Sequence, residues 1–201
     1  TNVLNMLELG GIPLLASERG ENDPIIIGGG PCAYNAEPIA DFFDVLDIGE
    51  GEEMLPRFTR MYARMKREGA SRAEILRATS HLDGFYVPAL YEVEYGADGT
   101  ISSFEPKYDD IPRTVQKQII ADLDSVYFPD KFVMPYIETV HDRIVPEVYR
   151  GCIRGCRFCQ AGMIYRPVRE KSPDVLDAQC RRLYENTGFD EISLCSLSIS
   201  D

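Results

Sequence analysis

Tryptophan is absent from this 201-residue sequence, histidine occurs twice, and the 21 lysines and arginines are outnumbered by 33 aspartates and glutamates. A formal net charge of −12 argues against broad nucleic-acid binding, which relies on basic surfaces. No run approaches the ~18 apolar residues of a membrane-spanning helix, so we expect no membrane partner. An apolar fraction of 44% nevertheless predicts a globular protein with a substantial core.

Targeting signals are also missing. The start at Thr1 has no basic segment, no signal-type apolar run and no initiator methionine. We therefore expect a piece of a longer protein that is located in the cytoplasm. Without a signal peptide, a disulfide framework is the weaker interpretation of the six cysteines.

The first 70 residues predict part of an open α/β domain. The apolar run 24–27 leads into Gly28, Gly29 and Gly30, which is typical of a buried parallel strand followed by a tight loop. A second short strand is expected over 45–48, and 53–67 has the apolar spacing of a helix. Strand, loop, strand, loop and helix follow one another as in an open parallel sheet.

Residues 71–143 are predicted to connect two domains. They begin with a helix over 72–78, and the runs 91–95 and 100–104 flank a glycine-containing turn, as in a β-hairpin. The stretch 105–143 is rich in prolines and aromatics and has little periodicity. We expect an extended linker on the surface there.

The last 58 residues, 144–201, predict one βαβ unit. A strand is expected over 144–149, a helix begins at Ser172 as its N-cap and continues to about 186, and another strand follows over 191–195. A loop rich in glycine and arginine lies between the first strand and the helix.

Three cysteines of that loop, Cys152, Cys156 and Cys159, are spaced C-x3-C-x2-C. Such short spacing lets three thiolates converge on one inorganic cluster. A 4Fe–4S cluster normally takes four thiolates, so three would leave one iron open for chemistry. A structural zinc site and plain buried thiols are the alternatives, although zinc commonly takes four ligands and neither Cys180 nor His141 is well placed as the fourth.

Phe158, directly before the third cysteine, and the position of the loop between a strand and a helix make the sequence resemble the radical S-adenosylmethionine (SAM) superfamily. The resemblance implies a (β/α) barrel and a 4Fe–4S cluster on Cys152, Cys156 and Cys159, with Phe158 packed beside it. The open iron would chelate SAM. Reductive cleavage to a 5′-deoxyadenosyl radical that acts on an unknown substrate, and an electron donor such as flavodoxin or ferredoxin, are implied too.

The stretches 149–162, 25–31 and 47–52 resemble the branch whose barrel follows a cobalamin-binding-like domain. In that family the glycine loop contacts a nucleotide-like cofactor tail, which makes Gly28, Gly29 and Gly30 candidates for cofactor binding. The cobalamin ligand motif D-x-H-x-x-G is absent, so cobalamin stays open. A bare structural loop, or a relaxed dinucleotide fingerprint G-x-G-x-x-A over 28–33, are the alternatives.

The family motif that holds the amino group of SAM would fall near 197–200, where no Gly-Gly-Glu occurs. Ser198 and Ser200 are the candidates there. A barrel of about 200 residues cannot be built from 144–201, so we expect a catalytically incomplete piece whose catalytic residues are unknown.

The stretch from Arg150 to Lys171 holds six basic residues and one acidic residue. It suggests a site for anionic groups, and tRNA is one hypothesis for the substrate. For Arg166 and Arg169, a solvated cationic face is the competing interpretation.

The predicted fold is therefore α/β, with a truncated cobalamin-binding-like sheet domain over 1–70, a linker over 71–143 and the start of a radical SAM barrel over 144–201. The predicted function is a radical SAM enzyme fragment. The alternative is a non-catalytic iron–sulfur or zinc module that binds a partner protein. Cys32 and Cys195 are expected to be small core residues.

Overall fold

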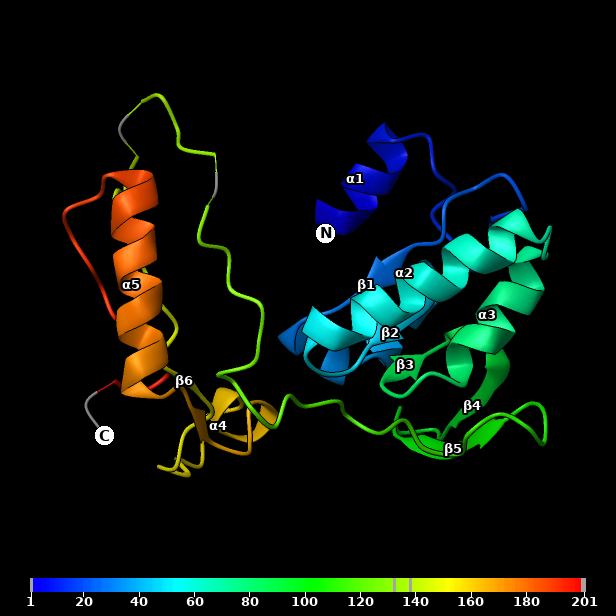
Figure 1. Ribbon diagram of the computed structural model, residues 1–201. Coiled ribbons are helices and arrows are strands. Elements are labelled where there is room, and N and C mark those ends of the chain that lie inside the picture. Colours follow the sequence, from blue (N-terminus) through cyan, green and yellow to red (C-terminus); the bar gives the residue numbers. More distant parts are fainter. Residues whose placement is uncertain (1, 132, 138, 200–201) are drawn as a thin grey trace. The chain divides into compact units, whose positions relative to one another are not determined.

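The computed structural model describes residues 2–131, 133–137 and 139–199. The chain forms two compact units, Thr1–Ile119 and Ile120–Asp201. Figure 1 shows the first unit in blue to green and the second in green to red. No helix among the described residues is long and apolar enough to cross a membrane.

A small mixed sheet forms the centre of the first unit. Its strands are β1 (Ile27–Gly28), β2 (Val45–Asp47) and β3 (Phe85–Tyr86), in the order β1-β2-β3. Strands β1 and β2 pair in parallel as predicted, but β1 overlaps the expected strand over 24–27 only at Ile27. The antiparallel β3 was not predicted. The whole of β2 is buried, as its continuous apolar run Val45-Leu46 requires.

Three helices belong to this unit: α1 (Asn2–Leu9), α2 (Gly51–Arg67) and α3 (Arg72–Ser80). The amphipathic α2 buries Met54 and Phe58 in a cluster with Val45 and Phe85 of the sheet. Helices α2 and α3 were predicted, and a capping box starts α3. Four short 3₁₀ helices complete the unit: η1 (Ala16–Glu18), η2 (Pro31–Tyr34), η3 (Glu37–Phe42) and η4 (Pro88–Leu90).

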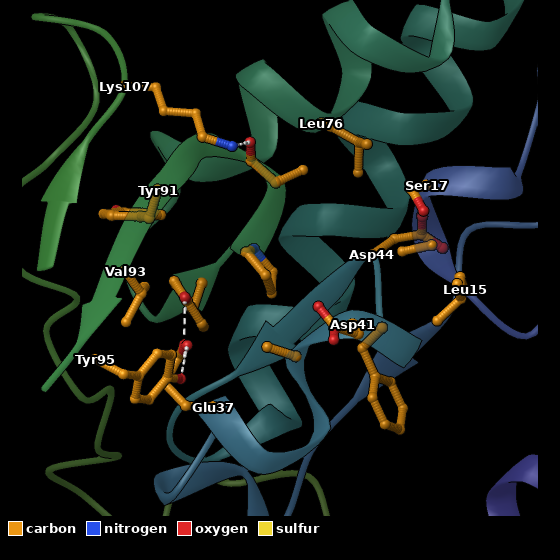
Figure 2. A pocket seen from close by; sticks show the side chains of 16 residues that line it. Leu15, Ser17, Glu37, Asp41, Asp44, Leu76, Tyr91, Val93, Tyr95 and Lys107 are labelled. Carbon is orange, nitrogen blue, oxygen red and sulfur yellow. Dashed lines mark hydrogen bonds between the residues drawn. The ribbon is translucent and has the colours of Figure 1, made fainter. Parts of the chain in front are cut away.

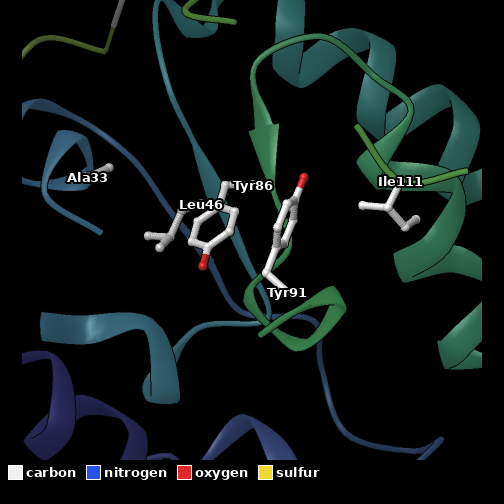
Figure 3. Close-up of a cluster of buried hydrophobic side chains, with 5 residues drawn as sticks. All are labelled: Ala33, Leu46, Tyr86, Tyr91 and Ile111. Atoms are coloured by element: carbon white, nitrogen blue, oxygen red, sulfur yellow. The ribbon is translucent and has the colours of Figure 1, made fainter. Parts of the chain in front are cut away.

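The predicted hairpin is confirmed as β4 (Tyr91–Tyr95) and β5 (Ile101–Pro106), which pair antiparallel. Its Tyr91 ring lies 5.1 Å from the ring of Tyr86 in the buried cluster shown in Figure 3. Ile111 belongs to the same cluster. The hairpin is thus part of the core of the first unit.

The expected surface linker over 105–143 is wrong in part. Ile111, Ile120 and Leu123 are each at most 6% exposed. These isolated apolar side chains are buried because moving apolar surface out of water is favourable even where the backbone is irregular. A stretch without periodicity can therefore still supply core residues.

The second unit contains a parallel pairing of two chain segments. Ile144 bridges Ile192 and Glu147 bridges Cys195, both in parallel. Between these segments in sequence lies the predicted helix, α5 (Pro173–Thr187), whose N-cap Ser172 accepts a hydrogen bond from the Val175 N–H. The remaining elements are β6 (Tyr149–Arg150), α4 (Ala161–Ile164) and β7 (Arg169–Glu170).

A buried ion triad holds the first unit together. The Asp44 carboxylate lies 2.9 Å from Arg19 Nη1 and 2.7 Å from Arg72 Nη2, and it accepts a hydrogen bond from the Ile26 N–H at 2.8 Å. The Asp44 side chain is 1% exposed and that of Arg19 is fully buried. Burial of three charges is tolerated only because they satisfy one another.

We predict that Asp44→Ala destabilises the protein strongly, by about 3–5 kcal/mol, because it leaves two arginines buried without their carboxylate. Urea denaturation followed by circular dichroism measures this. The matched control is Glu53→Ala, which breaks the exposed pair of Glu53 with Arg57 at 3.0 Å. That change is expected to cost less than ~0.5 kcal/mol. Equal losses in the two variants would contradict a structural role of the triad.

Candidate functional site

The cysteine loop is closed at its base by the antiparallel pair β6 and β7, in which Tyr149 lies opposite Glu170. Gly151 follows β6 directly and has φ 92°. A Cβ at Gly151 would lie 2.9 Å from the carbonyl oxygens of Tyr165 and Pro167. Only glycine fits this close approach, which fixes where the loop leaves the sheet immediately before Cys152.

The three loop cysteines are free thiols of differing exposure. Cys152 and Cys159 are half-buried, and Cys156 is exposed. The Cys159 N–H donates to the Cys156 carbonyl at 3.0 Å, which makes a turn of the last C-x2-C segment. The Gly162 N–H lies 3.4 Å from Cys159 Sγ and donates to it. This hydrogen bond ties the sulfur to the backbone of α4.

The loop offers three soft thiolate donors, the ligand type that iron–sulfur clusters take. Within the described ranges, however, no group of three or more His, Cys, Asp or Glu side chains lies close enough to hold a metal ion. The three thiols are thus of the ligand type that a cluster takes, but the structure does not bring them together, so they would have to converge around it.

The other residues predicted beside the cluster are placed as follows. Phe158 is 91% exposed. Ser198 is half-buried, and its carbonyl accepts a hydrogen bond from the Tyr149 hydroxyl. Ser200 lies outside the described residues. The roles of Phe158, Ser198 and Ser200 stay predictions.

Two basic residues of the cationic stretch are structural. Arg169 is 8% exposed, and its Nη1 donates to the Ile120 carbonyl at 2.7 Å. Lys171 is buried, with Nζ 4.6 Å from the centroid of the Phe128 ring. The expectation that Arg169 reaches a substrate or belongs to a solvated face is wrong, because its guanidinium anchors the backbone.

In the first unit, the predicted glycine loop packs against a carboxylate. A Cβ at Gly29 would lie 2.0 Å from Asp47 Oδ1, so the Asp47 side chain occupies the space that glycine leaves. Gly28 ends β1 and Asp47 ends β2, which places both at the carboxyl edge of the parallel pair. This contact supports a structural role for Gly29.

A cavity of about 500 Å³ opens beside the same loop. It is lined by Gly28 and Gly29, by Val3 and Leu4 of α1, and by Cys32. Its largely apolar wall offers space for an apolar ligand group next to the glycines. Contact of Gly28, Gly29 and Gly30 with a cofactor stays a prediction.

The cysteines outside the cluster loop are placed differently from the prediction. Cys32 and Cys195 are exposed, so the expectation of small core residues is wrong. Cys32 lies on η2 and lines the cavity, and Cys195 pairs in parallel with Glu147. Cys180 is half-buried on α5, where burial, followed by the charge of Asp177, raises the pKa of its thiol.

Asp47 is a polar residue at this edge that the sequence reasoning missed. It is 6% exposed, and no residue in the described part of the chain donates a hydrogen bond to its carboxylate. Burial raises its pKa above the ordinary value of 3.8. The sequence feature that could have indicated Asp47 is an aspartate at the end of a predicted buried strand, followed two residues later by glycine.

We predict that Asp47→Asn raises the melting temperature by a few degrees at neutral pH. A carboxyl whose pKa is raised by folding stabilises the fold while protonated, and this contribution is lost as pH rises through the folded pKa. The gain should therefore shrink as pH falls toward 3.8. Melting curves at several pH values measure it, with the exposed Asp109→Asn as the charge-matched control. A gain in both variants, or one that is constant with pH, would contradict the assignment.

Comparison with known proteins points to one class. Residues 1–88 match the family model described as radical SAM proteins, N-terminal. This match supports the radical SAM superfamily, and with it an enzyme class, from a part of the chain that does not contain the cysteine loop.

The chain is also similar to the uncharacterized protein MJ0966 of Methanocaldococcus jannaschii. The two are 27% identical over 187 residues, which is 90% of this chain. The chain spans about a third, 34%, of the length of that relative. The similarity thus extends through both units described above.

Proposed function

We propose that this chain is part of a radical SAM enzyme, in which Cys152, Cys156 and Cys159 hold a 4Fe–4S cluster. The observation that carries the proposal is a loop of three free thiols, closed by β6 and β7, in a chain whose residues 1–88 match the N-terminal family of radical SAM proteins. The family and the loop are independent indications because they lie in different parts of the sequence.

The residues around the loop have definable tasks. Gly151 directs the chain away from β6, and the Gly162 N–H donates to Cys159 Sγ, which ties that sulfur to α4. The exposed Phe158 is available to cover one side of a bound group. When bound, the cluster would supply the electron that cleaves SAM reductively. An electron donor of the flavodoxin or ferredoxin kind would act at this exposed loop.

We place SAM at the carboxyl end of the parallel pairing in the second unit. The segments that start at Ile144 and Ile192 run parallel, so their carboxyl ends share one edge. The hydrogen bond from the Tyr149 hydroxyl to the Ser198 carbonyl ties these two ends together beside the start of the cysteine loop. In βα-built enzymes this edge carries the active site, which supports Ser198 as a SAM-binding candidate, while Ser200 is proposed from the sequence alone.

The finer architecture belongs to the same proposal. A truncated cobalamin-binding-like domain over 1–70 is supported by the parallel strands β1 and β2 and by the cavity beside Gly28 and Gly29. The connecting segment over 71–143, whose helix α3 and hairpin pack into the first unit, and the barrel start over 144–201 complete the assignment. Cobalamin itself has no ligand motif in this sequence and is left open.

We predict that the purified protein, reconstituted anaerobically, binds about four irons and about four acid-labile sulfides per chain. The variant with Cys152, Cys156 and Cys159 all changed to alanine should lose both, because the loop then has no thiol left to ligate iron. The matched control changes the other three cysteines, Cys32, Cys180 and Cys195, to alanine and should keep both. Iron and sulfide assays and the absorption spectrum measure this.

Addition of SAM to the reconstituted protein should perturb the spectrum of the cluster, because an open iron would bind it. Iron and sulfide retained in the triple loop variant would contradict the ligand assignment. Zinc without sulfide would overturn the enzyme proposal and favour the alternative, a structural metal module that binds a partner protein.

A further inference from the structure

A second cavity in the first unit takes no part in the proposed radical chemistry. Its volume is about 540 Å³, and it lies among η1, η3, β3 and β4. Its size falls in the range of small-molecule sites, which are about 300–1,000 Å³. Figure 2 shows its lining side chains, with Glu37 and Asp41 rising from η3.

Glu37 is held in place by two phenols. Tyr86 donates its hydroxyl proton to Oε1 at 2.6 Å, and Tyr95 donates to Oε2 at 3.2 Å. Burial, and then the hydrogen bond to Glu37, raise the pKa of the Tyr86 hydroxyl, so it remains a donor at all ordinary pH values. A carboxylate has about four acceptor sites, so about two remain for a ligand.

Asp41 faces the same cavity from the other end of η3. It is exposed, and no side-chain hydrogen bond or ion pair joins it to another described residue. Asp44 also lines the cavity, but its charge is taken up by Arg19 and Arg72. Among the lining residues, Glu37 and Asp41 are thus the carboxylates without a cationic partner.

The single basic residue among those lining the cavity is Lys107. Its Nζ donates to the Ala89 carbonyl at 2.9 Å, which ties it to η4. The remaining wall is apolar and aromatic, with Leu15, Phe43 and Leu76 as examples. The cavity therefore combines two carboxylates at one side with a surface suited to methylene groups.

We propose that this cavity binds a small organic ammonium cation carried on an aliphatic chain, of the diamine or polyamine class. The ammonium would be held by charge-assisted hydrogen bonds to Glu37 and Asp41, near the Tyr95 side chain that also lines the cavity. The aliphatic chain would lie along the apolar wall. An anionic ligand would instead meet two carboxylates.

Isothermal titration calorimetry with putrescine, a four-carbon diamine, tests the proposal. Physiological salt screens the nonspecific attraction of this cation to the acidic protein surface. Wild type should bind saturably, whereas uncharged 1,4-butanediol, of matching chain length, should not. Asp41→Asn and Glu37→Gln should each weaken binding by about tenfold or more, which corresponds to ~1.4 kcal/mol. Asp41→Asn is the sharper variant because Asp41 makes no side-chain hydrogen bond within the described chain, whereas Glu37 also braces η3.

The matched control is Glu92→Gln, on the neighbouring strand β4 but outside the cavity lining, which should leave the affinity unchanged. Melting curves of all three variants show whether the fold is retained. Absence of saturable binding by wild type, equal weakening in Glu92→Gln and Asp41→Asn, or equal binding of the diol would each overturn the proposal. The loop cysteines are untouched in these variants, so the outcome is independent of the cluster.

Discussion

One buried carboxylate, that of Asp44, determines the arrangement of the first unit. Asp44 directly precedes β2, and it accepts the Ile26 N–H just before β1, so it aligns the start of two neighbouring strands. Its ion pair with Arg72 adds the first residue of α3, and its pair with Arg19 adds the segment after η1. Four chain segments thus meet at one charge in a place from which water is excluded. A carboxylate buried there is stable only when its arginines and the Ile26 N–H are all in place. The ion triad therefore favours this one arrangement of the four segments.

That alignment has a direct consequence at the opposite edge of the sheet. With β1 and β2 starting together and running parallel, they also end together, at Gly28 and Asp47. The second unit follows the same rule, since its parallel segments end near the cysteine loop and Ser198. In both units, the candidate binding residues lie where parallel strands end, as is general for α/β proteins. Sequence positions far apart are brought to one edge by strand direction alone.

Much of this fold could be predicted because its signals are local. The capping residues Ser71 and Ser172 indicate where helices α3 and α5 begin, and a glycine-containing turn indicates the β4–β5 hairpin. The antiparallel strand β3 has two residues and pairs with β2 through contacts that no local pattern encodes. The exposure of Cys32 was also not predicted, because no local sequence pattern encodes whether a cysteine is buried.

The fate of polar residues was harder to predict than that of apolar ones. A cysteine or an arginine can lie in the core or on the surface, and its tertiary contacts determine whether it is buried. Arg169 is buried because the Ile120 carbonyl lies within 2.7 Å, and Asp47 because Gly29 leaves it room. For the candidate site, the spacing of Cys152, Cys156 and Cys159 was readable from the sequence, whereas their mutual arrangement depends on the conformation of the loop.

The cysteine loop is anchored unevenly, and this bears on how it would receive a cluster. Its first cysteine follows the tightly packed Gly151, and its third accepts the Gly162 N–H, so both ends are held by backbone contacts. Cys156 lies between them in the exposed part of the loop. Convergence of three thiols would therefore require an adjustment within the loop between these two ends. Since metal binding contributes its free energy to the ordering of the ligands, the cluster itself would supply the stabilisation for that adjustment.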